Sequence, residues 1–506
     1  MNLERLITAL APTGVVKRAS VGVRDLAYDG RAVRPGALFF CVPGLRHDGH
    51  DFAAEAVAAG AVALVCERPL PLPVPQLLVA DARRAMAVAA AAFFGEPTRE
   101  LRVAGVTGTN GKTTTAYLLA SILGAAGLQT GLLGTVESRV GGEVRPLART
   151  TPEAIDLQRA FSDMLAAGDQ ACAMEASSIA AALHRLDGTR FAALAFTNLT
   201  QDHLDFHGTM ERYFEAKRLL FVPAAAAPPP AAVNSADPWG RRLAGELRAR
   251  GEAPLLTFGF ADDADVRPEG LQLDGAGARF TAGGVHVESR LRGRFNVENV
   301  LGAVAVSLLL GLPAEAISVG IAALPGVPGR FEAVDEGQPF TVVVDYAHTP
   351  AGLENVLLTA RELARATGGR VIAVFGAGGD RDRGKRPEMG RIASQQADIA
   401  IVTSDNPRSE RPESIIAEVV DGSIAEVEVE SERSAAIARA VGQARAGDIV
   451  VIAGKGHEQG QEVAGVTHAF DDRVVAAEAL RALGRGVSRG GAAGGGAAGC
   501  PAGATP

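Results

Sequence analysis

The sequence predicts an α/β protein of three domains, with parallel sheets in the second and third domains. The chain has 506 residues, of which 47% are apolar, so it is long enough to bury several cores. At 101–106 an apolar, strand-like run is followed by a Gly-rich loop and then by a helix-like stretch. After residue 330 four apolar runs alternate with helix-like stretches, which is typical of a doubly wound parallel sheet.

Residues 1–97 are expected to form a small N-terminal α/β domain. Three apolar runs in this part, ALFFCVPG, AVALVCE and QLLVAD, alternate with Ala-rich amphipathic stretches. The stretch GEPTREL at 95–101 is typical of a connector. We therefore place the first domain boundary between residues 97 and 98.

Residues 98–328 are predicted to form a central, P-loop ATPase-like domain. LRVAGV at 101–106 has the composition of a buried strand, and TTTAYLLASILGAAG at 113–127 that of a helix closed by glycine. The runs ACAM and FAALAF predict two further strands, and the Pro-rich segment at 223–234 is expected to be a surface loop. Glycine and proline concentrate at 324–330, which marks the second boundary.

Residues 329–485 are predicted to form a C-terminal, Rossmann-like doubly wound domain. Its four apolar runs are FTVVVDY, RVIAVFG, ADIAIVTSD and DIVVIAGKG. Each run ends in residues such as Gly, Asp, Asn or His, at the place where such sheets bind their ligands. Residues 486–506 are low in complexity and are expected to form a disordered tail.

Charge and cysteine content exclude several classes of protein. The formal charge of −8 argues against a broad basic surface, so we expect no nucleic-acid partner. The four cysteines lack metal-ligand spacing, which fits a reducing compartment. Glu4 and Arg5 interrupt the start of the chain, and no run of about 18 uncharged apolar residues occurs. We expect a cytoplasmic protein with no membrane insertion.

The stretch GVTGTNGKTTT at 105–115 predicts a phosphate-binding loop. Gly108 and Gly111 would let backbone N–H groups approach phosphate oxygens, and Lys112 would place a cation on the terminal phosphates. The hydroxyl of Thr113 would bind Mg²⁺. The match to G-x-x-x-x-G-K-[ST] is imperfect because Val106 stands at the first glycine. The alternative is a Gly-rich turn that binds nothing.

Two acidic segments are candidates for metal binding. Glu175 directly follows a strand-like run and carries the oxygen ligands that Mg²⁺ prefers, although a solvated carboxylate at a strand end would have the same pattern. The segment FTNLTQDHLDFHG contains Asp202, His203, Asp205 and His207. It fits metal ligation, and it also fits a capped turn with surface histidines.

Polar loops follow the strand-like runs of the third segment. Asp345 and His348 are suited to a ribose or base contact. The glycines at 376, 378 and 379 do not complete G-x-G-x-x-G because residue 381 is arginine. The basic side chains in this segment instead suggest an anion-binding loop; they are Arg381, Arg383, Lys385 and Arg386.

Two further turns carry charged residues. SDNPRSE at 404–410 contains Arg408, a residue type that binds carboxylates through two parallel hydrogen bonds. AGKGHE at 453–458 is a Gly-rich turn with a charged tip. Each of these loops taken alone also fits an ordinary surface turn.

Together these motifs resemble the Mur ligases, the ATP-dependent amide-forming enzymes of peptidoglycan precursor synthesis. The likeness extends from about residue 20 to 483. TGTNGKTT at 107–114 is similar to that family's phosphate loop, which also lacks the early glycine. DNPR at 405–408 resembles the motif of the members that add meso-diaminopimelate to the D-Glu of UDP-MurNAc-L-Ala-D-Glu.

The resemblance implies a nucleotide and metal site. It implies Mg²⁺ bound by Thr113 and Glu175, a second Mg²⁺ at His203, and a carbamate (N6-carboxylysine) on Lys217 that joins the metal site. Lys112, Lys217, His203 and Glu175 would be the catalytic set. The residues implied to bind ATP are Gly108, Thr109, Asn110, Gly111, Lys112, Thr113, Thr114, Asn296, Asn299, Arg330 and Asp345.

The resemblance also implies two substrate sites, with residues 1–97 as a UDP-sugar-binding domain and residues 329–485 as an amino-acid-binding ligase domain. The residues implied to bind the UDP-MurNAc dipeptide are Tyr28, Gly30, Thr150, Thr151, Ser177 and Arg185. Those implied to bind diaminopimelate are Arg386, Asp405, Asn406, Pro407, Arg408, Gly454 and Glu458. Two positions depart from the family pattern: Gly30 stands where serine is frequent, and Leu183 where glutamine is frequent.

The implied reaction converts the D-Glu γ-carboxylate into an acyl phosphate, which the amine of diaminopimelate then attacks. Closure of the third domain would exclude water, and Arg408 would select the acceptor by its second carboxylate. We expect a monomer. The alternatives are a sibling ligase such as a folylpolyglutamate synthase, a P-loop switch or motor protein, and a non-catalytic binding protein.

Overall fold

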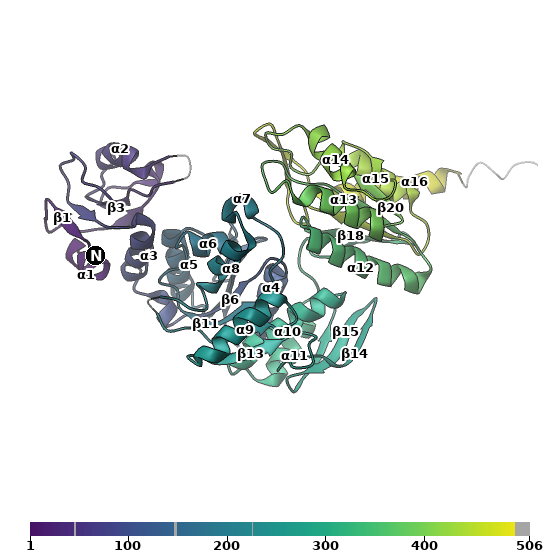
Figure 1. The fold of residues 1–506 in the computed structure, drawn as a ribbon, viewed down its shortest axis with the longest axis horizontal. Coiled ribbons are helices and arrows are strands. Elements are labelled where there is room, and N and C mark those ends of the chain that lie inside the picture. Colours follow the sequence, from purple (N-terminus) through teal and green to yellow (C-terminus); the bar gives the residue numbers. More distant parts are fainter. Residues whose placement is uncertain (45–46, 146–148, 225, 491–506) are drawn as a thin grey trace, which may run out of the picture. The chain divides into compact units, whose positions relative to one another are not determined.

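The computed structural model describes residues 1–44, 47–145, 149–224 and 226–490. The chain divides into two compact units, which we describe separately (Figure 1). The first unit comprises Met1–Thr200 and Phe206–Pro325, and the second comprises Gln201–Asp205 and the chain from Gly326 onward. The boundary between residues 97 and 98 lies inside the first unit and stays a prediction. None of the described helices is long and apolar enough to cross a membrane.

The N-terminal part of the first unit contains a five-stranded sheet in the order β1-β5-β4-β3-β2, in which only β1 is antiparallel to its neighbour. The three apolar runs predicted from sequence are β3, β4 and β5. The strands β3 and β4 are fully buried and β5 is buried except for the partly buried Leu78, because both faces are covered. The elements are α1 (Leu3–Leu10), β1 (Gly14–Val16), β2 (Asp25–Ala27), η1 (Gly30–Ala32), β3 (Ala37–Phe40), η2 (Gly49–Phe52), α2 (Ala53–Ala58), β4 (Ala63–Cys66), β5 (Gln76–Leu78) and α3 (Ala82–Phe93).

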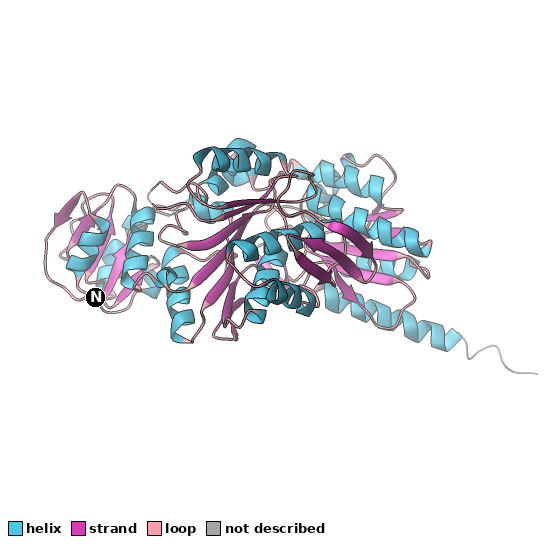
Figure 2. Cartoon of the chain, turned by 90° about the horizontal axis from the view of Figure 1, so that it is seen from below, coloured by secondary structure: helices cyan, strands magenta, loops and turns pink. Residues whose placement is uncertain are grey.

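The rest of the first unit is built on an eight-stranded sheet in the order β13-β12-β11-β6-β10-β7-β8-β9. The strand β6 lies between β10 and β11, parallel to both. Helices flank the strands of this sheet on both sides (Figure 2). The strands are β6 (Arg102–Thr107), β7 (Thr130–Leu133), β8 (Ser138–Val140), β9 (Glu143–Arg145), β10 (Ala171–Glu175), β11 (Phe191–Phe196), β12 (Ala231–Asn234) and β13 (Leu255–Phe258).

The helices of this part pack apolar faces onto the sheet. The helix after the Gly-rich loop is α4, as predicted. The helical elements are η3 (Pro97–Arg99), α4 (Lys112–Ala125), α5 (Ala154–Ala166), α6 (Ser178–Ala182), α7 (Leu204–His207), α8 (Met210–Arg218), α9 (Pro238–Arg250), α10 (Arg294–Leu309) and α11 (Ala314–Ala323). A three-stranded antiparallel sheet, β14 (Glu269–Asp274), β15 (Gly277–Ala282) and β16 (Val285–Ser289), was not expected from sequence.

The strand β12 corrects one prediction, because the segment 223–234 was expected to be a surface loop. Ala231 to Asn234 instead form a buried strand between β11 and β13. The carbonyl of Pro230 accepts a hydrogen bond from the N–H of Leu194, so the sheet pairing begins at the last proline. Proline lacks an N–H but keeps its acceptor, so a Pro-rich run can lead directly into a strand.

The second unit contains a six-stranded sheet in the order β17-β18-β22-β19-β20-β21. The four predicted apolar runs are its four central strands, which are parallel, so the predicted α/β, doubly wound sheet is confirmed. One face packs against α15 and α16. The strands are β17 (Glu332–Val334), β18 (Thr341–Asp345), β19 (Val371–Phe375), β20 (Ile399–Val402), β21 (Glu428–Val429), β22 (Ile449–Ala453), β23 (Gly460–Val463) and β24 (Val466–Ala469).

The helices of the second unit are α12 (Pro350–Thr367), α13 (Lys385–Gln396), α14 (Pro412–Asp421), α15 (Arg433–Gln443) and α16 (Asp472–Gly490). Helix α16 continues past residue 485, where the disordered tail was predicted to begin. The tail prediction is therefore corrected for residues 486–490. Its remainder, 491–506, lies outside the described residues.

Candidate active site

The Gly-rich loop joins β6 to α4 and has a backbone that only glycine fits at two positions. Gly108 has φ +150° and Gly111 has φ +87°. A Cβ on Gly108 would lie 1.8 Å from the hydroxyl oxygen of Thr197, and one on Gly111 would lie 2.2 Å from Oδ1 of Asn299. The loop leads into the N-terminus of α4, where the first backbone N–H groups of a helix have no partner within the helix. This geometry suits an anion such as a phosphate.

The loop is held in shape by the segment that follows β11. The hydroxyl of Thr197 donates to the carbonyl of Asn110 at 2.6 Å. Asn198 accepts from the N–H of Asn110 through Oδ1 at 2.9 Å, and its carbonyl accepts from the N–H of Thr109. The loop therefore has its shape fixed by neighbouring residues of the same unit.

Two lysines converge on one carbonyl of this loop. The Nζ of Lys112 donates to the carbonyls of Gly108 at 3.0 Å and Thr109 at 2.8 Å. The Nζ of Lys217, in α8, donates to the carbonyl of Gly108 at 2.8 Å. Lys217 is 1% exposed, and its Nζ lies 4.6 Å from the ring centre of Tyr213. Two ammonium groups beside one loop create a local field that favours anions.

Glu175, at the end of β10, brings a buried carboxylate to the same loop. It is 1% exposed, and its Oε1 accepts from the hydroxyl of Thr113 at 3.0 Å. The N–H and hydroxyl of Thr135 also donate to this carboxylate, at 2.6 and 3.1 Å. Across the described residues Glu175 makes no ion pair. A buried carboxylate beside a hydroxyl is a set of hard oxygen ligands and fits a divalent cation.

Four residues predicted to bind a nucleotide-sugar dipeptide lie beside the same strand end. The hydroxyl of Thr151 donates to the carbonyl of Glu175 at 2.9 Å and accepts from the N–H of Ser177 at 3.2 Å. Arg185 donates to the carbonyl of Thr151 at 3.2 Å, and the hydroxyl oxygen of Thr150 lies 3.1 Å from that of Thr135. Ser177 and Arg185 are therefore both hydrogen-bonded to Thr151, next to Thr150.

Glu153 gathers three arginines beside these residues. Its carboxylate lies 2.9 Å from Arg185, 3.2 Å from Arg149 and 3.6 Å from Arg83. Burial lowers the pKa of the Arg185 guanidinium, and the like charges of Arg149 and Arg83 lower it further, whereas Glu153 raises it. Three cations around one carboxylate leave an excess of positive charge, which suits a phosphate-bearing ligand.

Tyr28 and Gly30 come from the N-terminal sheet region. The hydroxyl of Tyr28 donates to Asp156 in α5 at 2.8 Å, and burial raises the pKa of this tyrosine. Gly30 begins the short helix η1, which Asp29 caps by accepting from the N–H of Arg31. Tyr28 is thus hydrogen-bonded to the central sheet region, whereas Gly30 has no side chain and its role stays a prediction.

The two asparagines predicted to bind nucleotide lie on the first turns of α10. Asn299 donates to Oδ1 of Asn296 at 2.9 Å, and Asn296 donates to the carbonyl of Arg292 at 2.8 Å. Both asparagines are buried, and Asn299 lies beside Gly111. Asn299 therefore lines the phosphate-binding loop, and Asn296 holds its side-chain amide in place.

In the second unit, Asp345 ends β18 and accepts two backbone hydrogen bonds. Its carboxylate accepts from the N–H groups of Phe331 and Ala347, each at 2.7 Å. Burial raises the pKa of Asp345, whereas the charge of Arg330 and these hydrogen bonds lower it. The guanidinium of Arg330 lies over the ring of Tyr346, 4.5 Å from its centre. Arg330 and Asp345 thus belong to one cluster.

Asp202 and His203 lie in the short segment that groups with the second unit. The carboxylate of Asp202 lies 3.2 Å from Nε2 of His203 and 3.9 Å from Nε2 of His348. Burial raises the pKa of Asp202, but these two histidines and Lys385 outweigh it and lower the pKa to about 2. His207 is instead buried in the first unit, where its ring stacks on Tyr213, so it is not a surface histidine.

Arg386 is buried at the start of α13 and is paired with two carboxylates. Its guanidinium lies 2.7 Å from Glu410 and 2.9 Å from Glu418, and it also donates to the carbonyl of Gly378. The predicted contact between Arg386 and a ligand carboxylate stays a prediction, because the observed partners are acidic residues of the same unit.

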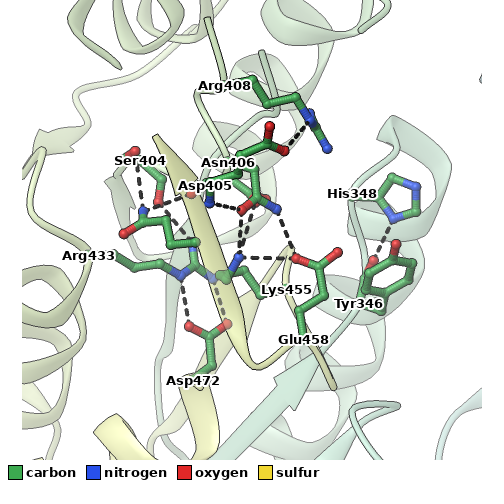
Figure 3. Close-up of polar contacts among 12 residues, drawn as sticks. Tyr346, His348, Ser404, Asp405, Asn406, Arg408, Arg433, Lys455, Glu458 and Asp472 are labelled. Atoms are coloured by element: carbon green, nitrogen blue, oxygen red, sulfur yellow. Dashed lines mark hydrogen bonds and ion pairs between the residues drawn. The ribbon is translucent and has the colours of Figure 1, made fainter. Parts of the chain in front are cut away.

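The loop after β20 carries Asp405, Asn406, Pro407 and Arg408 and contacts the hairpin β23–β24. Arg408 has φ +53°, donates to the carbonyl of Gly379 at 2.7 Å and lies 3.3 Å from the carboxylate of Glu462 (Figure 3). Its backbone N–H donates to the carbonyl of Glu462 at 3.0 Å. The hairpin therefore holds both the backbone and the side chain of Arg408.

The turn after β22 meets this loop from the other side. Asn406 donates to Oε2 of Glu458 at 2.8 Å, and Lys455 donates to both residues (Figure 3). A Cβ on Gly454, which has φ +122°, would lie 2.6 Å from the carboxylate of Asp405. Asp405, Asn406, Gly454 and Glu458 thus lie together, with Arg408 in the same loop, and their role in binding diaminopimelate stays a prediction.

Three family models match successive parts of the chain. They describe the Mur ligase family catalytic domain (residues 23–109), the Mur ligase middle domain (106–307) and the Mur ligase glutamate ligase domain (329–456). A relative from Solibacter usitatus is 48% identical over 96% of this chain and 99% of its own length. The chain is a member of the Mur ligase family.

Individual Mur ligases extend this likeness. The Solibacter relative and one from Geobacillus kaustophilus, 46% identical over 96% of this chain and all of its own length, are named UDP-N-acetylmuramoyl-L-alanyl-D-glutamate–2,6-diaminopimelate ligases. A solved structure of the same name is 35% identical, with a TM-score of 0.64 over 91% of this chain and 95% of its own. The family resemblance inferred from the motifs is therefore confirmed.

Two lysines of this Mur ligase were missed by reasoning from residue patterns alone. Lys217 was singled out only by the family resemblance, and Lys455 not at all. Lys217 shares the buried face of α8 with Tyr213 and Phe214, at spacings of four and three residues. A lysine at core spacing was the available signal. Lys455 follows a buried strand between two glycines, a pattern that also fits a surface turn.

The residues of this Mur ligase that are predicted to bind metal ions are of several types. Among the residues that the structure describes, no three His, Cys, Asp or Glu side chains group around one point. The predicted set instead combines Thr113 and Glu175 with His203 and a modified Lys217. Thr113 and Glu175 are in contact at 3.0 Å, and the other two members stay predictions.

Proposed function

We propose that this Mur ligase joins meso-diaminopimelate to the D-Glu γ-carboxylate of UDP-MurNAc-L-Ala-D-Glu with ATP as the energy source, in peptidoglycan precursor synthesis. The relatives of this name, at 48% and 46% identity over nearly the whole chain, support the substrates. The observation that carries the reaction type is the phosphate loop with the buried Glu175 beside it. Phosphoryl transfer needs this combination of anion-binding loop and cation ligands.

Residues of β10, α4 and α8 would supply oxygen ligands for one Mg²⁺. The hydroxyl of Thr113 and the carboxylate of Glu175 would hold one ion together with a carbamate on Lys217, and His203 would contact a second. When bound, Mg²⁺ offsets negative charge on the transferring phosphoryl group. The Nζ of Lys112, which lies on the loop carbonyls, would supply positive charge to the same group.

The carbamate forms when the uncharged Nζ of Lys217 bonds to the carbon of CO₂ and releases one proton. Its support is the position of Lys217, a buried lysine whose Nζ lies 2.8 Å from the Gly108 carbonyl beside the ammonium of Lys112. Converting one ammonium to a carboxylate removes the repulsion between two like charges. We expect a ¹³C signal from protein incubated with ¹³CO₂ that is absent from Lys217→Ala; an equal signal from both proteins would contradict the modification.

The reaction has two steps. A γ-carboxylate oxygen attacks the γ-phosphorus of ATP, and the bond to ADP breaks to give an acyl phosphate. The uncharged amine of the acceptor then attacks the carbonyl carbon, and phosphate leaves with the bonding electrons while the amine loses a proton. A carboxylate does not react directly with an amine because O⁻ is a poor leaving group, so ATP activates it.

Diaminopimelate carries two amino groups and two carboxylates, so its far end presents a carboxylate that lysine lacks. In the proposed site Arg408 binds that carboxylate, and Asp405 and Glu458 face ammonium groups. Lysine would leave Arg408 without its ligand, and a site built to hold a polar group discriminates strongly against an analogue that lacks it. A cytoplasmic location and a monomeric state also belong to this proposal, to be tested by cell fractionation and light scattering.

The proposal is tested by product mass. The protein is incubated with Mg-ATP, UDP-MurNAc-L-Ala-D-Glu and either meso-diaminopimelate or L-lysine. We expect a tripeptide product only with diaminopimelate. A product only with lysine would overturn the specificity, and no product with either amino acid would favour a sibling ligase.

A further inference from the structure

A buried lysine with no role in the proposed reaction lies at the centre of the acceptor loops. Lys455 directly follows Gly454 at the end of β22, and its side chain is 0% exposed. Its Nζ donates to Oδ1 of Asn406 at 3.0 Å and to Oε2 of Glu458 at 3.1 Å, and lies 4.0 Å from Asp405 (Figure 3). Burying an ammonium group is costly unless it is paired and hydrogen-bonded, which is the case here.

These contacts set the orientation of the Asn406 amide. Oδ1 accepts from Lys455 and from the backbone N–H of Glu462 at 3.0 Å, while Nδ2 donates to Glu458 at 2.8 Å. A rotated amide would place its NH₂ against two donors and its oxygen against a carboxylate. Lys455 therefore contributes one of the two donors that fix which end of Asn406 meets Glu458.

The two carboxylate oxygens of Glu458 differ in their hydrogen bonds. Oε2 accepts from both Lys455 and Asn406, whereas within the described part of the chain Oε1 makes no hydrogen bond. The Glu458 side chain is 31% exposed, so its carboxylate still reaches solvent although hydrogen bonds hold Oε2 in place. Together Asp405, Glu458 and Lys455 carry one net negative charge, which matches one ammonium group of a ligand.

We propose that Lys455 is a positioning residue for the acceptor amino acid, which holds Asn406 and one oxygen of Glu458 so that the other oxygen meets an ammonium group of the acceptor. The proposal rests on the proposed function, because it takes the acceptor to be an amino acid bound at these loops. Lys455 acts through Asn406 and Glu458 and does not itself contact the reacting atoms.

The test is the kinetics of Lys455→Met with each of the three substrates. Loss of a hydrogen bond to a charged group corresponds to a change of about tenfold or more in an equilibrium constant. We expect KM for diaminopimelate to rise about tenfold or more, while KM for ATP and for the nucleotide dipeptide stays within about twofold. A purely structural role would change all three KM values or none. An unchanged KM for diaminopimelate would overturn the proposal.

The matched control is Arg370→Met. Arg370 pairs at 2.7 Å with Asp448, the residue directly before β22. The change therefore also removes a paired cation, but at the end of β22 opposite to Lys455. We expect normal KM values for all three substrates from this variant. A selective rise in KM for diaminopimelate in Arg370→Met would mean that general loosening of β22 explains the effect, and would overturn the role of Lys455.

A double variant tests whether Lys455 acts through Glu458. If it does, Lys455→Met/Glu458→Gln should have nearly the same KM for diaminopimelate as Glu458→Gln alone. If the two fold-changes multiply, the residues act independently and the proposal fails. Should Lys455→Met not fold, Lys455→Gln is measured instead, because its shorter and uncharged side chain does not reproduce the contacts of the ammonium group, and the same selective rise in KM is required of it.

Tripeptide formation by the protein without substitutions distinguishes failure of this proposal from failure of the proposed function. If it makes no tripeptide, the proposed function fails and the role of Lys455 falls with it. If it makes the tripeptide and Lys455→Met has a normal KM for diaminopimelate, only the role of Lys455 is overturned.

Discussion

The loop after β6 and the loops after β20 and β22 occupy equivalent places at the ends of parallel strands but are held by different contacts. In the first, Lys112 and Lys217 both donate to the backbone carbonyl of Gly108. In the second, Lys455 pairs with Glu458, and Arg408 with Glu462. At the first loop both lysines meet a backbone carbonyl, whereas at the second each of these cations lies beside a carboxylate.

This difference suits two kinds of ligand. A loop with concentrated positive charge and helix N–H groups binds a polyanion such as a nucleotide phosphate. A loop with alternating cations and carboxylates binds a molecule that carries both charges, such as an amino acid. The same strand–loop position therefore yields a phosphate site or an amino-acid site, depending on where the carboxylates lie.

The largest effect is expected from Lys112→Ala, which removes positive charge from the phosphate loop. Because this charge would act on the transferring phosphoryl group, kcat should fall about 10²–10³-fold. Steady-state kinetics measures the change. Arg102→Ala is the control, since Arg102 is exposed at the start of β6, the opposite end of the strand that leads into the loop. A loss of kcat below about threefold in Lys112→Ala would contradict the assignment of this loop.

Arg408→Glu should produce the next largest effect, confined to the acceptor. The new carboxylate would repel the far carboxylate of diaminopimelate, so kcat/KM for this substrate should fall about 10–100-fold while KM for ATP is unchanged. Arg411→Glu makes the same charge change three residues away on a side chain that is 83% exposed, and should be neutral. Full activity of Arg408→Glu would remove Arg408 from the specificity argument.

Thr151→Val tests the link between Glu175 and the nucleotide-dipeptide residues. The hydroxyl joins the carbonyl of Glu175 to the N–H of Ser177, so its loss should raise KM for the nucleotide dipeptide about fivefold. Thr130→Val is the control, because Thr130 pairs with Ala171 at the other end of β10. Equal KM values in the two variants would contradict a role of Thr151 in this site.

The smallest effect is an acid dependence of stability in the second unit. The hydrogen bond from Arg386 lowers the pKa of Glu410 from its ordinary value of 4.5 to about 2. A carboxyl group with a lowered pKa stabilises the fold above its unfolded pKa and loses that contribution as the pH falls through the folded value. The midpoint temperature of thermal unfolding should therefore decrease as the pH is lowered from about 4.5 to about 2. In Glu410→Gln this decrease should be less steep.

The control for this effect is Glu413→Gln, which removes an exposed carboxylate three residues further along, in the first turn of α14. It should leave the acid dependence as it is in the unchanged protein. The same slope in Glu410→Gln and Glu413→Gln would mean that the Arg386 pair does not carry this part of the stability.

The strands and the phosphate loop could be predicted from sequence because their patterns are local. Parallel strands buried on both faces need continuous apolar runs, and the loop needs glycine at fixed spacing. Lys217 could not be found this way, since it contacts Gly108 across 109 positions of sequence. The same holds for Lys455 and Asn406, which are 49 positions apart.

The strand β12 and the helix beyond residue 485 were missed for a different reason. Prolines and glycines there pointed to irregular structure, but tertiary pairing with β11 and β13 favours a strand at Ala231–Asn234. Local composition reflects the secondary structure that an isolated segment prefers, and packing against neighbouring elements can override that preference.

The most direct test of the account follows oxygen from the substrate carboxylate. UDP-MurNAc-L-Ala-D-Glu labelled with ¹⁸O in the γ-carboxylate is incubated with Mg-ATP and meso-diaminopimelate, and the released phosphate is examined by mass. An acyl phosphate predicts that one labelled oxygen moves into phosphate for each tripeptide formed, because the C–O bond breaks when the amine attacks. Tripeptide formation with unlabelled phosphate would contradict the account.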